Sequence, residues 1–412
     1  MKICLLSYRG NPYCGGQGIY LYYLARELVK LGHDVHVLVG PPYPLSMDGA
    51  KLHKVHNFNF YNFEKSFLSA PNPLQCFSPL HFYELAAARV GIFPEMFAFS
   101  FRSFKMIKEL LEKEQFDIIH DNQCLGYGLL LMKHFNIPVV STVHHPLFID
   151  RKIEFEHHPR FCDKYRRVLY YPLIMQKFVT KRLDGIITVS ESSANDIRRY
   201  FKVPRKKIWV VYNGVDTDLF QRSNGIPKER KRLIFVGNTD DRKKGVLYLL
   251  QAMKKLDDDV KLTIVDGGAP RKRFAPKVVS NYGLGDRVTF TGKIESTNDL
   301  AKLYSSSNIA IVPSLYEGFG FPAAEAMSCE LPVVASNISA LPEVVGNGEC
   351  GVLVPPRNPD ALASGIKQLL RNEDRMIQMG KSARKRVEDL FSWEEATKNV
   401  VSVYEEVLSA YR

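Results

Sequence analysis

The sequence alternates short apolar runs with longer amphipathic stretches along most of its length, and this alternation limits the fold more than any other feature. The short runs are rich in Val, Ile and Leu, which is typical of strands that are buried on both faces. The longer stretches between them are typical of helices that cover such strands. Repeated strand and helix units of this kind form parallel sheets. The sequence therefore predicts an α/β protein with doubly wound parallel sheets.

The alternation occurs twice, and a chain of 412 residues exceeds the roughly 250–300 residues at which a single core stops growing. A polar segment with Pro and Gly follows Phe220 and has the composition of a linker. We predict a first domain at 1–212, a second at 213–390, and a C-terminal helix at 391–412 that returns to the first. The predicted strands are 3–7, 34–39, 116–120, 137–143, 185–190 and 208–212, then 232–236, 260–266, 287–292, 308–313, 331–336 and 350–354.

A segment at about 41–105 interrupts this rhythm and is dense in aromatic residues and proline. Its rings could simply pack the segment onto the first domain. Alternatively, they could form an apolar groove for an acceptor or a surface that touches a membrane. The sequence leaves both interpretations open.

Charge and cysteine content narrow the choice of binding partners and of cellular compartment. The formal net charge of +12 indicates a surface that attracts an anion, which could be a nucleotide, a nucleic acid or an acidic lipid. The seven cysteines form no C-x-x-C pair, so a reducing compartment is expected. We find no signal peptide and no apolar run of the ~18–20 residues that cross a bilayer. We expect a cytoplasmic protein, with peripheral contact at the inner face of the cytoplasmic membrane as an option.

The most specific motif runs from Glu317 to Glu325 and follows a predicted strand and its loop. Gly318 and Gly320 allow the backbone to approach a ligand closely, and Pro322 suits the first turn of a helix. The amides and dipole of such a helix start favour a phosphate group. The two carboxylates remain available for hydroxyl groups. A sugar nucleotide has hydroxyls on both sides of its diphosphate.

This stretch resembles the E-x7-E motif of glycosyltransferase family 4, and the resemblance covers the whole chain. Each further landmark is weak alone, but their order and spacing together are specific. The landmarks are GGQG, TVHH, VYNGVD, FVGNTDDRKKG, IVDGG, VTFTGKI, LPVVAS and FSWEEATKNVVSVYEEV. The resemblance implies a GT-B fold, in which two Rossmann-like domains face each other across a cleft.

The resemblance also implies roles for the motif residues. Glu317 would contact the hydroxyls of the donor sugar, and Glu325 would contact the ribose. The backbone amides would meet the distal phosphate and the sugar. These amides belong to Gly318, Phe319, Gly320 and Phe321.

Members of this family clamp the diphosphate with an Arg and a Lys, but here Asn238 stands where the Arg is expected. The segment 237–245 is also one residue longer than the common pattern. The clamp is therefore assigned to Arg242 and Lys244, while Lys243 remains an alternative. A basic helix start with solvated charges is the other interpretation.

Gly15 and Gly16 match the glycine pair of the family, whose amides face the phosphates and the acceptor. A tight turn between strand and helix would also explain them. A dinucleotide fingerprint fails, because Leu21 stands at the third glycine position and the second strand lacks a terminal acidic residue.

His144 follows a predicted strand and matches the histidine that the family places close to the reacting sugar, whereas the adjacent His145 departs from the pattern. The resemblance further assigns Asp266, Gly267 and Ile294 to donor binding. A metal site is a minor alternative, because Glu154 and His158 are four residues apart on a predicted helix. The other residues of that group are Asp150, Glu156, His157 and Cys162.

Taken together, the resemblance implies a retaining hexosyltransferase that uses a UDP- or GDP-sugar, without a cofactor or metal ion. The expected acceptor is a lipid, a lipid-linked glycan or another hydroxyl compound. Two rival functions remain: another GT-B sugar-nucleotide enzyme, such as an epimerase or phosphorylase, and a basic nucleic-acid-binding protein. No nucleic-acid-binding motif is visible in the sequence.

Overall fold

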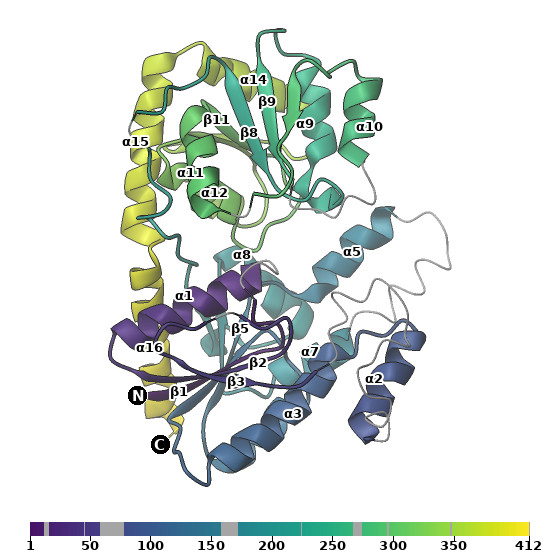
Figure 1. Cartoon of the computed structure of the whole chain (residues 1–412), viewed down its shortest axis with the longest axis vertical. Coiled ribbons are helices and arrows are strands. Elements are labelled where there is room, and N and C mark those ends of the chain that lie inside the picture. The colour runs from purple at the N-terminus through teal and green to yellow at the C-terminus, as the bar shows by residue number, and fades with distance from the viewer. Residues whose placement is uncertain are drawn as a thin grey trace. The chain divides into compact units, whose positions relative to one another are not determined.

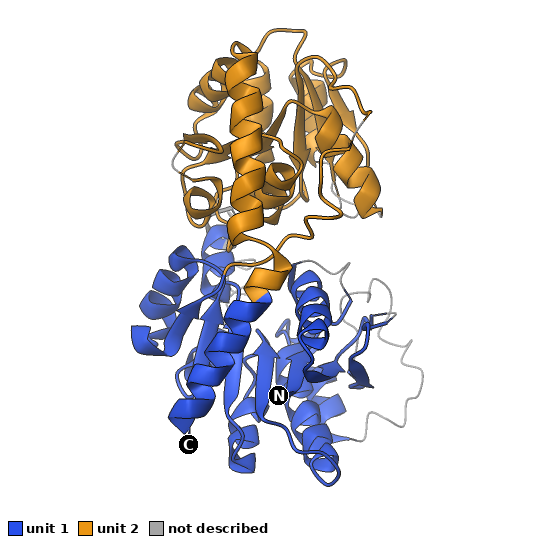
Figure 2. Cartoon of the chain, turned by 90° about the vertical axis from the view of Figure 1, so that its left-hand side faces the viewer, with its two compact units in different colours: residues 1–211, 397–412 blue, residues 212–396 orange. Residues whose placement is uncertain are grey.

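The computed structural model describes residues 1–11, 16–44, 46–57, 78–157, 172–223, 225–266, 274–294, 296–346 and 348–411. The chain forms two compact units (Figure 2). Unit 1 comprises Met1–Val211 together with Thr397–Arg412, and unit 2 comprises Tyr212–Ala396. The last helix, α16 (Trp393–Tyr411), begins in unit 2 and ends in unit 1.

Unit 1 contains a seven-stranded parallel sheet in the order β3-β2-β1-β4-β5-β6-β7 (Figure 1). Its strands are β1 (Lys2–Ser7), β2 (Asp34–Val39), β3 (Lys51–Lys54), β4 (Ile118–Asn122), β5 (Val139–Val143), β6 (Gly185–Thr188) and β7 (Ile208–Val210). Its helices are α1 (Gly16–Lys30), α2 (Pro79–Arg89), α3 (Glu95–Leu110), α4 (Gly128–Met132), α5 (Leu147–His157), α7 (Leu173–Thr180) and α8 (Glu191–Asp196). Shorter helical turns are η3 (Lys133–Phe135), η4 (Ile197–Phe201) and η5 (Arg205–Lys207).

Helices cover both faces of this sheet because its strands are apolar on both sides. Cys4 and Leu6 of β1 point into a core that α3, α4 and α7 close. The alternate residues Ile3 and Leu5 are equally buried and face the opposite side, since successive side chains of a strand alternate. On α16, Tyr404 is completely buried and reaches β4 through a hydrogen bond to His120.

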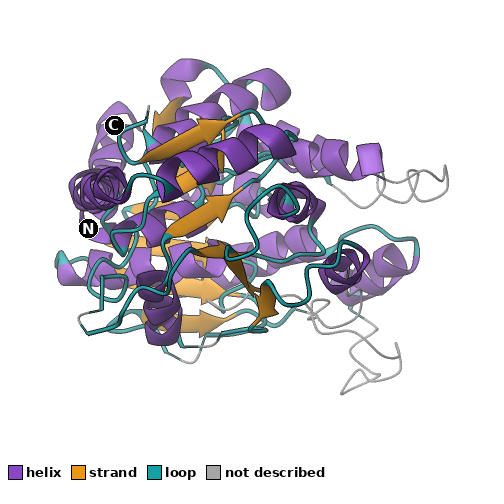
Figure 3. Ribbon diagram, turned by 90° about the horizontal axis from the view of Figure 1, so that it is seen from above, coloured by secondary structure: helices purple, strands orange, loops and turns teal. Residues whose placement is uncertain are grey.

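Unit 2 repeats the architecture with a six-stranded parallel sheet in the order β10-β9-β8-β11-β12-β13. Its strands are β8 (Arg232–Val236), β9 (Lys261–Val265), β10 (Val288–Phe290), β11 (Ile309–Val312), β12 (Val333–Ser336) and β13 (Gly351–Val354). Its helices are η6 (Arg242–Lys244), α9 (Val246–Met253), α10 (Phe274–Asn281), α11 (Thr297–Ser306), α12 (Phe321–Ser328), α13 (Leu341–Val345), α14 (Pro359–Leu370) and α15 (Glu373–Leu390). Figure 3 shows strands of the sheets lying between layers of helices.

The predicted fold is confirmed, since two Rossmann-like units with parallel sheets are present and every predicted strand forms. The sequence did not predict β3, because Lys51–Lys54 is a polar edge strand without an apolar run. The aromatic-rich range 41–105 includes β3, α2 and the first part of α3. Phe99 of α3 is fully buried in the core of unit 1, while Phe82 of α2 is 68% exposed. Residues 58–77 of that range lie outside the described residues.

In each unit the strand order reverses once, and that position fixes where a ligand can bind. The reversal lies between β1 and β4 in unit 1 and between β8 and β11 in unit 2. Loops leaving the carboxyl ends of two strands diverge there and leave a crevice, which is the usual ligand site of open α/β sheets. The basic segment 237–245 follows β8, and the motif from Glu317 to Glu325 follows β11. No helix in the described part of the chain combines the length and apolar character needed to cross a membrane.

In unit 2, one glycine holds the two loops of the reversal together. Gly245 caps α9 with φ +69°, and a Cβ atom there would lie 1.9 Å from the carbonyl oxygen of Pro313. The loop after β8 therefore packs directly on the loop after β11. Only glycine allows both this backbone conformation and this approach.

We expect Gly245→Ala to lower the free energy of unfolding clearly more than Gly283→Ala. Gly283 has a similar φ of +67° but no atom within 4 Å of the added Cβ. The control should therefore cost only the ~1–2 kcal/mol of a left-handed alanine, whereas Gly245→Ala must also move the Pro313 backbone. Urea unfolding of both variants measures the difference, and equal losses would contradict the close packing.

Candidate functional site

The loops after β8 and β11 of unit 2 bring a lysine and a glutamate together. The amide of Leu315 donates to the carbonyl oxygen of Lys243 at 2.6 Å and ties the loops to each other. Beside this bond, the Nζ of Lys244 lies 2.8 Å from Oε1 of Glu317. The two side chains are only 25% and 11% exposed, so solvent screens this pair incompletely. The structure thus joins two residues that the sequence assigned to the same site.

Side chains of the protein form hydrogen bonds to only one oxygen of the Glu317 carboxylate among the described residues. Its Oε1 accepts a hydrogen bond from the hydroxyl of Ser314 at 2.8 Å in addition to the bond from Lys244. Its backbone amide donates to Oγ of Ser339 at 2.9 Å. No described residue donates to Oε2. One carboxylate oxygen therefore remains available to accept a hydrogen bond from a ligand.

Unpaired amides lie at the start of α12, which follows the glutamate. Gly320 has φ +110° and begins the helix without a side-chain cap, and Pro322 occupies the first turn as predicted. Within the described part of unit 2, the amides of Phe319, Gly320 and Phe321 donate to no protein acceptor. Open amides at a helix start attract anionic oxygens. The ring of Phe319 is buried against Phe391, so only its backbone can face a ligand.

Glu325 lies one turn further along α12, where the protein disfavours its charge. Burial raises the pKa of this carboxyl to about 7, although the hydroxyl of Tyr304 donates to Oε2 at 3.2 Å and Lys244 attracts the charge. Tyr304 itself is fully buried. The carboxyl group therefore changes its charge close to neutral pH.

The other basic residues of the loop after β8 point to different partners. The guanidinium of Arg242 lies 5.3 Å from the ring centre of Phe274, and Nζ of Lys243 lies 3.7 Å from Asp241. Asn238 accepts a hydrogen bond from the amide of Asp240 at 2.9 Å, which shapes the turn. Of the three candidates for a phosphate clamp, only Lys244 contacts Glu317 in the structure.

The remaining donor-binding candidates of unit 2 lie near the ends of β9 and β10. Asp266 follows β9 and accepts a 3.3 Å hydrogen bond from the amide of Thr239, together with a bond from the Thr239 hydroxyl. Ile294 is partly exposed in the segment after β10. Gly267 lies outside the described residues.

In unit 1, His144 lies just beyond the end of β5 and is nearly buried. Its ring Nε2 is 2.8 Å from Oδ1 of Asn122, and the ring of Tyr20 meets it edge to face with 4.9 Å between centres. Burial, followed by the charges of His145 and His120, lowers the pKa of His144 to about 3. His144 is therefore neutral at physiological pH. Gly16 begins α1 in the same unit, and Gly15 lies outside the described residues.

Sequence reasoning missed the polar residues that surround these sites. At the end of β4, His120, Asp121, Asn122 and Gln123 are all at most 2% exposed. A run of four polar residues directly after the apolar positions Ile118 and Ile119 was the available signal, because buried polar groups need partners. The residues missed in unit 2 are Ser314, Ser339 and Tyr304.

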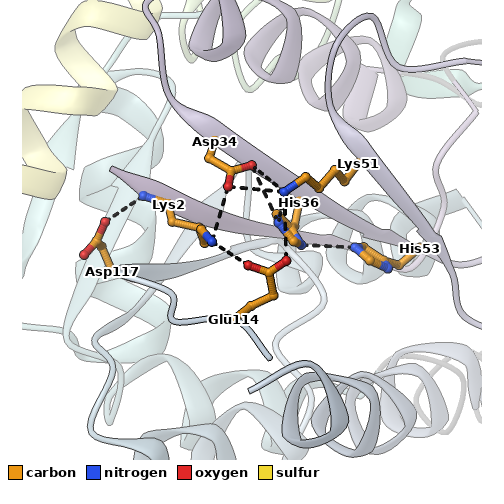
Figure 4. Close-up of polar contacts among 7 residues, drawn as sticks. All are labelled: Lys2, Asp34, His36, Lys51, His53, Glu114 and Asp117. Carbon is orange, nitrogen blue, oxygen red and sulfur yellow. Dashed lines mark hydrogen bonds and ion pairs between the residues drawn. The ribbon is translucent and has the colours of Figure 1, made fainter. Parts of the chain in front are cut away.

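One cluster in unit 1 offers three potential metal ligands at the amino ends of the strands (Figure 4). Oxygens of Asp34 and Glu114 and a ring nitrogen of His36 lie within 4.8 Å of one another. However, Nζ of Lys51 lies 3.2 Å from both Asp34 and His36, and Nζ of Lys2 lies 2.5 Å from Glu114. Ammonium groups already neutralise the carboxylates, so the cluster anchors the edge strand β3 and needs no metal ion.

The described residues give no support to the alternative metal site on α5. Oδ2 of Asp150 lies 2.8 Å from Nε2 of His145, which gives both residues a partner. The side chains of Glu154, Glu156 and His157 lie outside the described residues, as do His158 and Cys162 entirely.

We expect the free energy of unfolding of the Glu325→Gln variant to increase relative to that of the natural chain as the pH rises from 5 to 8. A raised carboxyl pKa means that the folded state keeps its proton while the unfolded state loses it, so rising pH costs stability between about 4.5 and 7. The amide avoids this loss of up to about 3 kcal/mol. Urea unfolding at both pH values measures it, with the exposed Glu373→Gln as control. A difference that does not change with pH would contradict the raised pKa.

Comparison with known proteins agrees with the two-unit division. The family profile described as "Glycosyltransferase Family 4" matches residues 14–219. The profile described as "Glycosyl transferases group 1" matches residues 216–386. The two profiles together cover the chain from the first loop to α15.

Similar proteins align over the full length. The chain is 38% identical to MMP alpha-(1->4)-mannosyltransferase of Mycolicibacterium hassiacum, over 99% of each chain. It resembles the structure of sucrose-phosphate synthase from Thermosynechococcus elongatus with a TM-score of 0.77 and 26% identity over 99% of each chain. It shares the fold of Anabaena Alr3699/HepE in complex with UDP-glucose, with a TM-score of 0.72 and 18% identity over 98% of this chain and all of the other.

The rival function of a nucleic-acid-binding protein finds no support in these relatives. The matched profiles, the full-length relative and the pair of Rossmann-like units agree with the resemblance that the motifs carried. The chain is a glycosyltransferase with the GT-B architecture and belongs to glycosyltransferase family 4.

Proposed function

We propose that the chain transfers an α-mannosyl group, with retention of configuration, from a nucleoside diphosphate mannose to a hydroxyl group of a glycan. The observation that carries the donor part is the geometry after β11. Lys244, the open oxygen of Glu317 and the unpaired amides of α12 form one polar surface in unit 2. Such a surface offers cationic and amide donors for phosphate oxygens, next to an acceptor for sugar hydroxyls.

Lys244 has the central role in this proposal. When a diphosphate binds, its ammonium group would exchange part of its contact with Glu317 for the phosphate oxygens. Negative charge grows on the diphosphate as the bond to the sugar breaks, and preorganised donors stabilise that charge. Lys244 and Arg242 would supply the positive charge, so the proposal needs no metal ion or other cofactor. Glu317 would hold the sugar hydroxyls, and Glu325 would accept hydrogen bonds from the ribose when ionised.

We infer retention by comparing the anomeric configuration of the donor with that of the product. Nucleoside diphosphate mannose is α-linked, and the name of the 38% identical relative specifies an α product. Glu317 is already engaged by Lys244 and Ser314, and it suits hydroxyl binding better than nucleophilic attack. We propose that the acceptor oxygen attacks the anomeric carbon from the face that the diphosphate leaves. The bond between carbon and phosphate oxygen breaks, and the acceptor proton passes to the diphosphate.

The donor nucleotide and the acceptor are the finer parts of the proposal. Alr3699/HepE was solved with UDP-glucose, while the mannosyl relative favours a mannose donor, so UDP- and GDP-linked sugars are both to be tested. The acceptor is inferred only from the relative named as an α-(1→4)-mannosyltransferase. A lipid or lipid-linked glycan remains an alternative acceptor.

We expect Lys244→Ala to lower nucleotide release from the preferred donor by about 100-fold or more, because one preorganised charge is lost. Slow release of nucleotide from GDP-, UDP- and ADP-linked mannose and glucose identifies the donor without an acceptor. Lys243→Ala removes the same charge from the adjacent position, whose side chain faces Asp241, and should change the rate much less. NMR of the glycosylated product reports its anomeric configuration.

Three results would each overturn a separate part of this proposal. Equal losses in the Lys244 and Lys243 variants would remove Lys244 from the site but leave sugar transfer intact. A β-linked product would contradict retention. Turnover abolished by EDTA and restored by a divalent cation would contradict a metal-free reaction.

Peripheral membrane contact remains a separate proposal, supported by one exposed helix stripe. On α7, Ile174 is 83% and Phe178 is 42% exposed. Lys177 lies between them in the sequence, and Lys181 follows the helix as its C-cap residue. Apolar side chains flanked by lysines suit the boundary of an anionic bilayer.

We expect the protein to sediment with vesicles that contain anionic phospholipid, and to be released by salt. The double substitution Ile174→Ser and Phe178→Ser should weaken this binding several-fold. Ile377→Ser and Leu390→Ser remove apolar residues of α15 that are 40% and 42% exposed, and they serve as the control. The absence of sedimentation at low salt would contradict membrane contact.

A further inference from the structure

Asn122 lies at the strand-order reversal of unit 1 and forms hydrogen bonds to three other segments. It ends β4, and its side-chain amide reaches the end of β1, the start of α1 and the loop after β5. Its Nδ2 donates to the backbone oxygen of Gln17 at 2.9 Å and to Oγ of Ser7 at 3.3 Å. Its Oδ1 lies 2.8 Å from Nε2 of His144. Asn122 is 2% exposed, so these contacts are shielded from water.

These contacts fix the orientation of the amide. A backbone carbonyl can only accept a hydrogen bond, so the nitrogen of Asn122 must face Gln17. The hydroxyl of Ser7 donates to the carbonyl of Arg9 at 2.7 Å and is therefore an acceptor toward Asn122. The remaining atom, Oδ1, is an acceptor and faces the histidine. Nε2 of His144 must then carry a hydrogen.

Gln123 holds the backbone of the same histidine. Its Oε1 accepts a hydrogen bond from the amide of His144 at 2.6 Å, and its Nε2 donates to the carbonyl of His145 at 2.8 Å. Gln123 has φ +53°, which is uncommon for a residue with a side chain. Backbone strain of this kind persists only where surrounding contacts impose it, and it is frequent at functional sites.

All polar groups of His144 except one are therefore engaged. The backbone amide is bound by Gln123, the carbonyl accepts from Oγ of Ser193 at 3.1 Å, and Nε2 is bound by Asn122. The ring plane is fixed by the edge-to-face contact with Tyr20. Among the described residues, Nδ1 has no hydrogen-bond partner. A neutral imidazole in this tautomer has a lone pair at Nδ1.

We propose that Asn122 and Gln123 are positioning residues that hold His144 as the Nε2–H tautomer and leave Nδ1 to accept a hydrogen bond from a sugar hydroxyl. The inference rests on the proposed function, because it assumes that His144 meets a bound sugar. It also excludes one role for His144. A lone pair repels a phosphate oxygen, so this ring is not a phosphate clamp.

Titratable groups near the ring also disfavour its charged form. His145 and His120 are the titratable groups whose positive forms would repel an imidazolium at His144. His120 is buried between the hydroxyls of Tyr404 and Thr142. Asp150 pairs with His145 and not with His144.

Long-range proton–nitrogen NMR of the full chain across pH 5–9 tests the inference, because it reports the tautomer and the pKa of the His144 ring. In the natural chain we expect His144 to stay neutral with the hydrogen on Nε2. The substitution Asn122→Asp places a carboxylate beside Nε2 and should raise the pKa of His144 by at least about one unit. It should also add an acid limb to the pH profile of kcat/KM. Asn122→Ala should lower kcat/KM by about 10–100-fold through misplacement of the ring.

Tyr404→Phe is the matched control, because it removes a buried hydrogen bond of His120 from the same polar region and leaves every hydrogen bond of His144 in place. Its ring signals and pH profile should remain unchanged. A hydrogen on Nδ1 in the natural chain, which needs no variant to detect, would overturn the inference. Unchanged ring signals and pKa in a folded Asn122→Asp protein would also overturn it.

Two further measurements identify the hydroxyl and separate this inference from the proposed function. If the donor sugar supplies it, Asn122→Ala weakens binding of the sugar nucleotide but not of the free nucleotide. If the acceptor supplies it, donor affinity is unchanged and the KM for the acceptor rises. Full transfer activity in a folded His144→Gln protein would overturn the hydroxyl contact, while the tautomer result and the proposed roles of Lys244 and Glu317 would stand. No change in either affinity would overturn the hydroxyl contact.

Discussion

Burial of both sheets on both faces is the constraint on which the rest of this structure depends. The strands are apolar on both sides, so helices must cover each face, and polar chemistry is left to the ends of the strands. The carboxyl ends of β1 and β4, and of β8 and β11, then lie at the positions where the strand order reverses. The site residues of each unit are placed there by topology before any specific contact forms.

The two units use this common position in different ways. Unit 2 presents charges and open amides, with Lys244 beside Glu317 at the start of α12. Unit 1 presents a buried network of neutral groups around His144 and Asn122. The first arrangement suits a diphosphate, whose charge needs donors. The second suits an uncharged sugar, because hydrogen-bond direction there depends on fixed tautomers and amide orientations.

Two groups with shifted pKa values show how burial, as the largest cause, sets their protonation states. Burial keeps His144 neutral, with a pKa of about 3, and brings the carboxyl of Glu325 to a pKa of about 7. Neither group has a fully charged partner at hydrogen-bond distance. By contrast, the charged cluster of Lys2, Asp34, Lys51 and Glu114 balances opposite charges at the other ends of the strands and serves the edge strand β3.

The sequence determined the fold class, the pair of sheets and the position of the principal motif, because apolar periodicity and glycine or proline placement are local properties. It missed β3, whose polar residues form a strand only because β2 offers an unpaired edge. It also assigned the phosphate clamp to Arg242 and Lys244 and kept Lys243 as an alternative. Only tertiary structure separated them, since the packing of Gly245 on Pro313 aims Lys244 alone at Glu317.

The polar residues at the end of β4 show the same division. The sequence places His120, Asp121, Asn122 and Gln123 directly after an apolar strand, but their partners lie far away in the chain. Gln17, His144 and Tyr404 come from three other segments, and the last is 284 residues from His120. Whether a buried polar residue is a liability or a positioning element depends on those distant partners. Each buried donor and acceptor needs a partner, and only the tertiary structure decides which distant residues supply those partners.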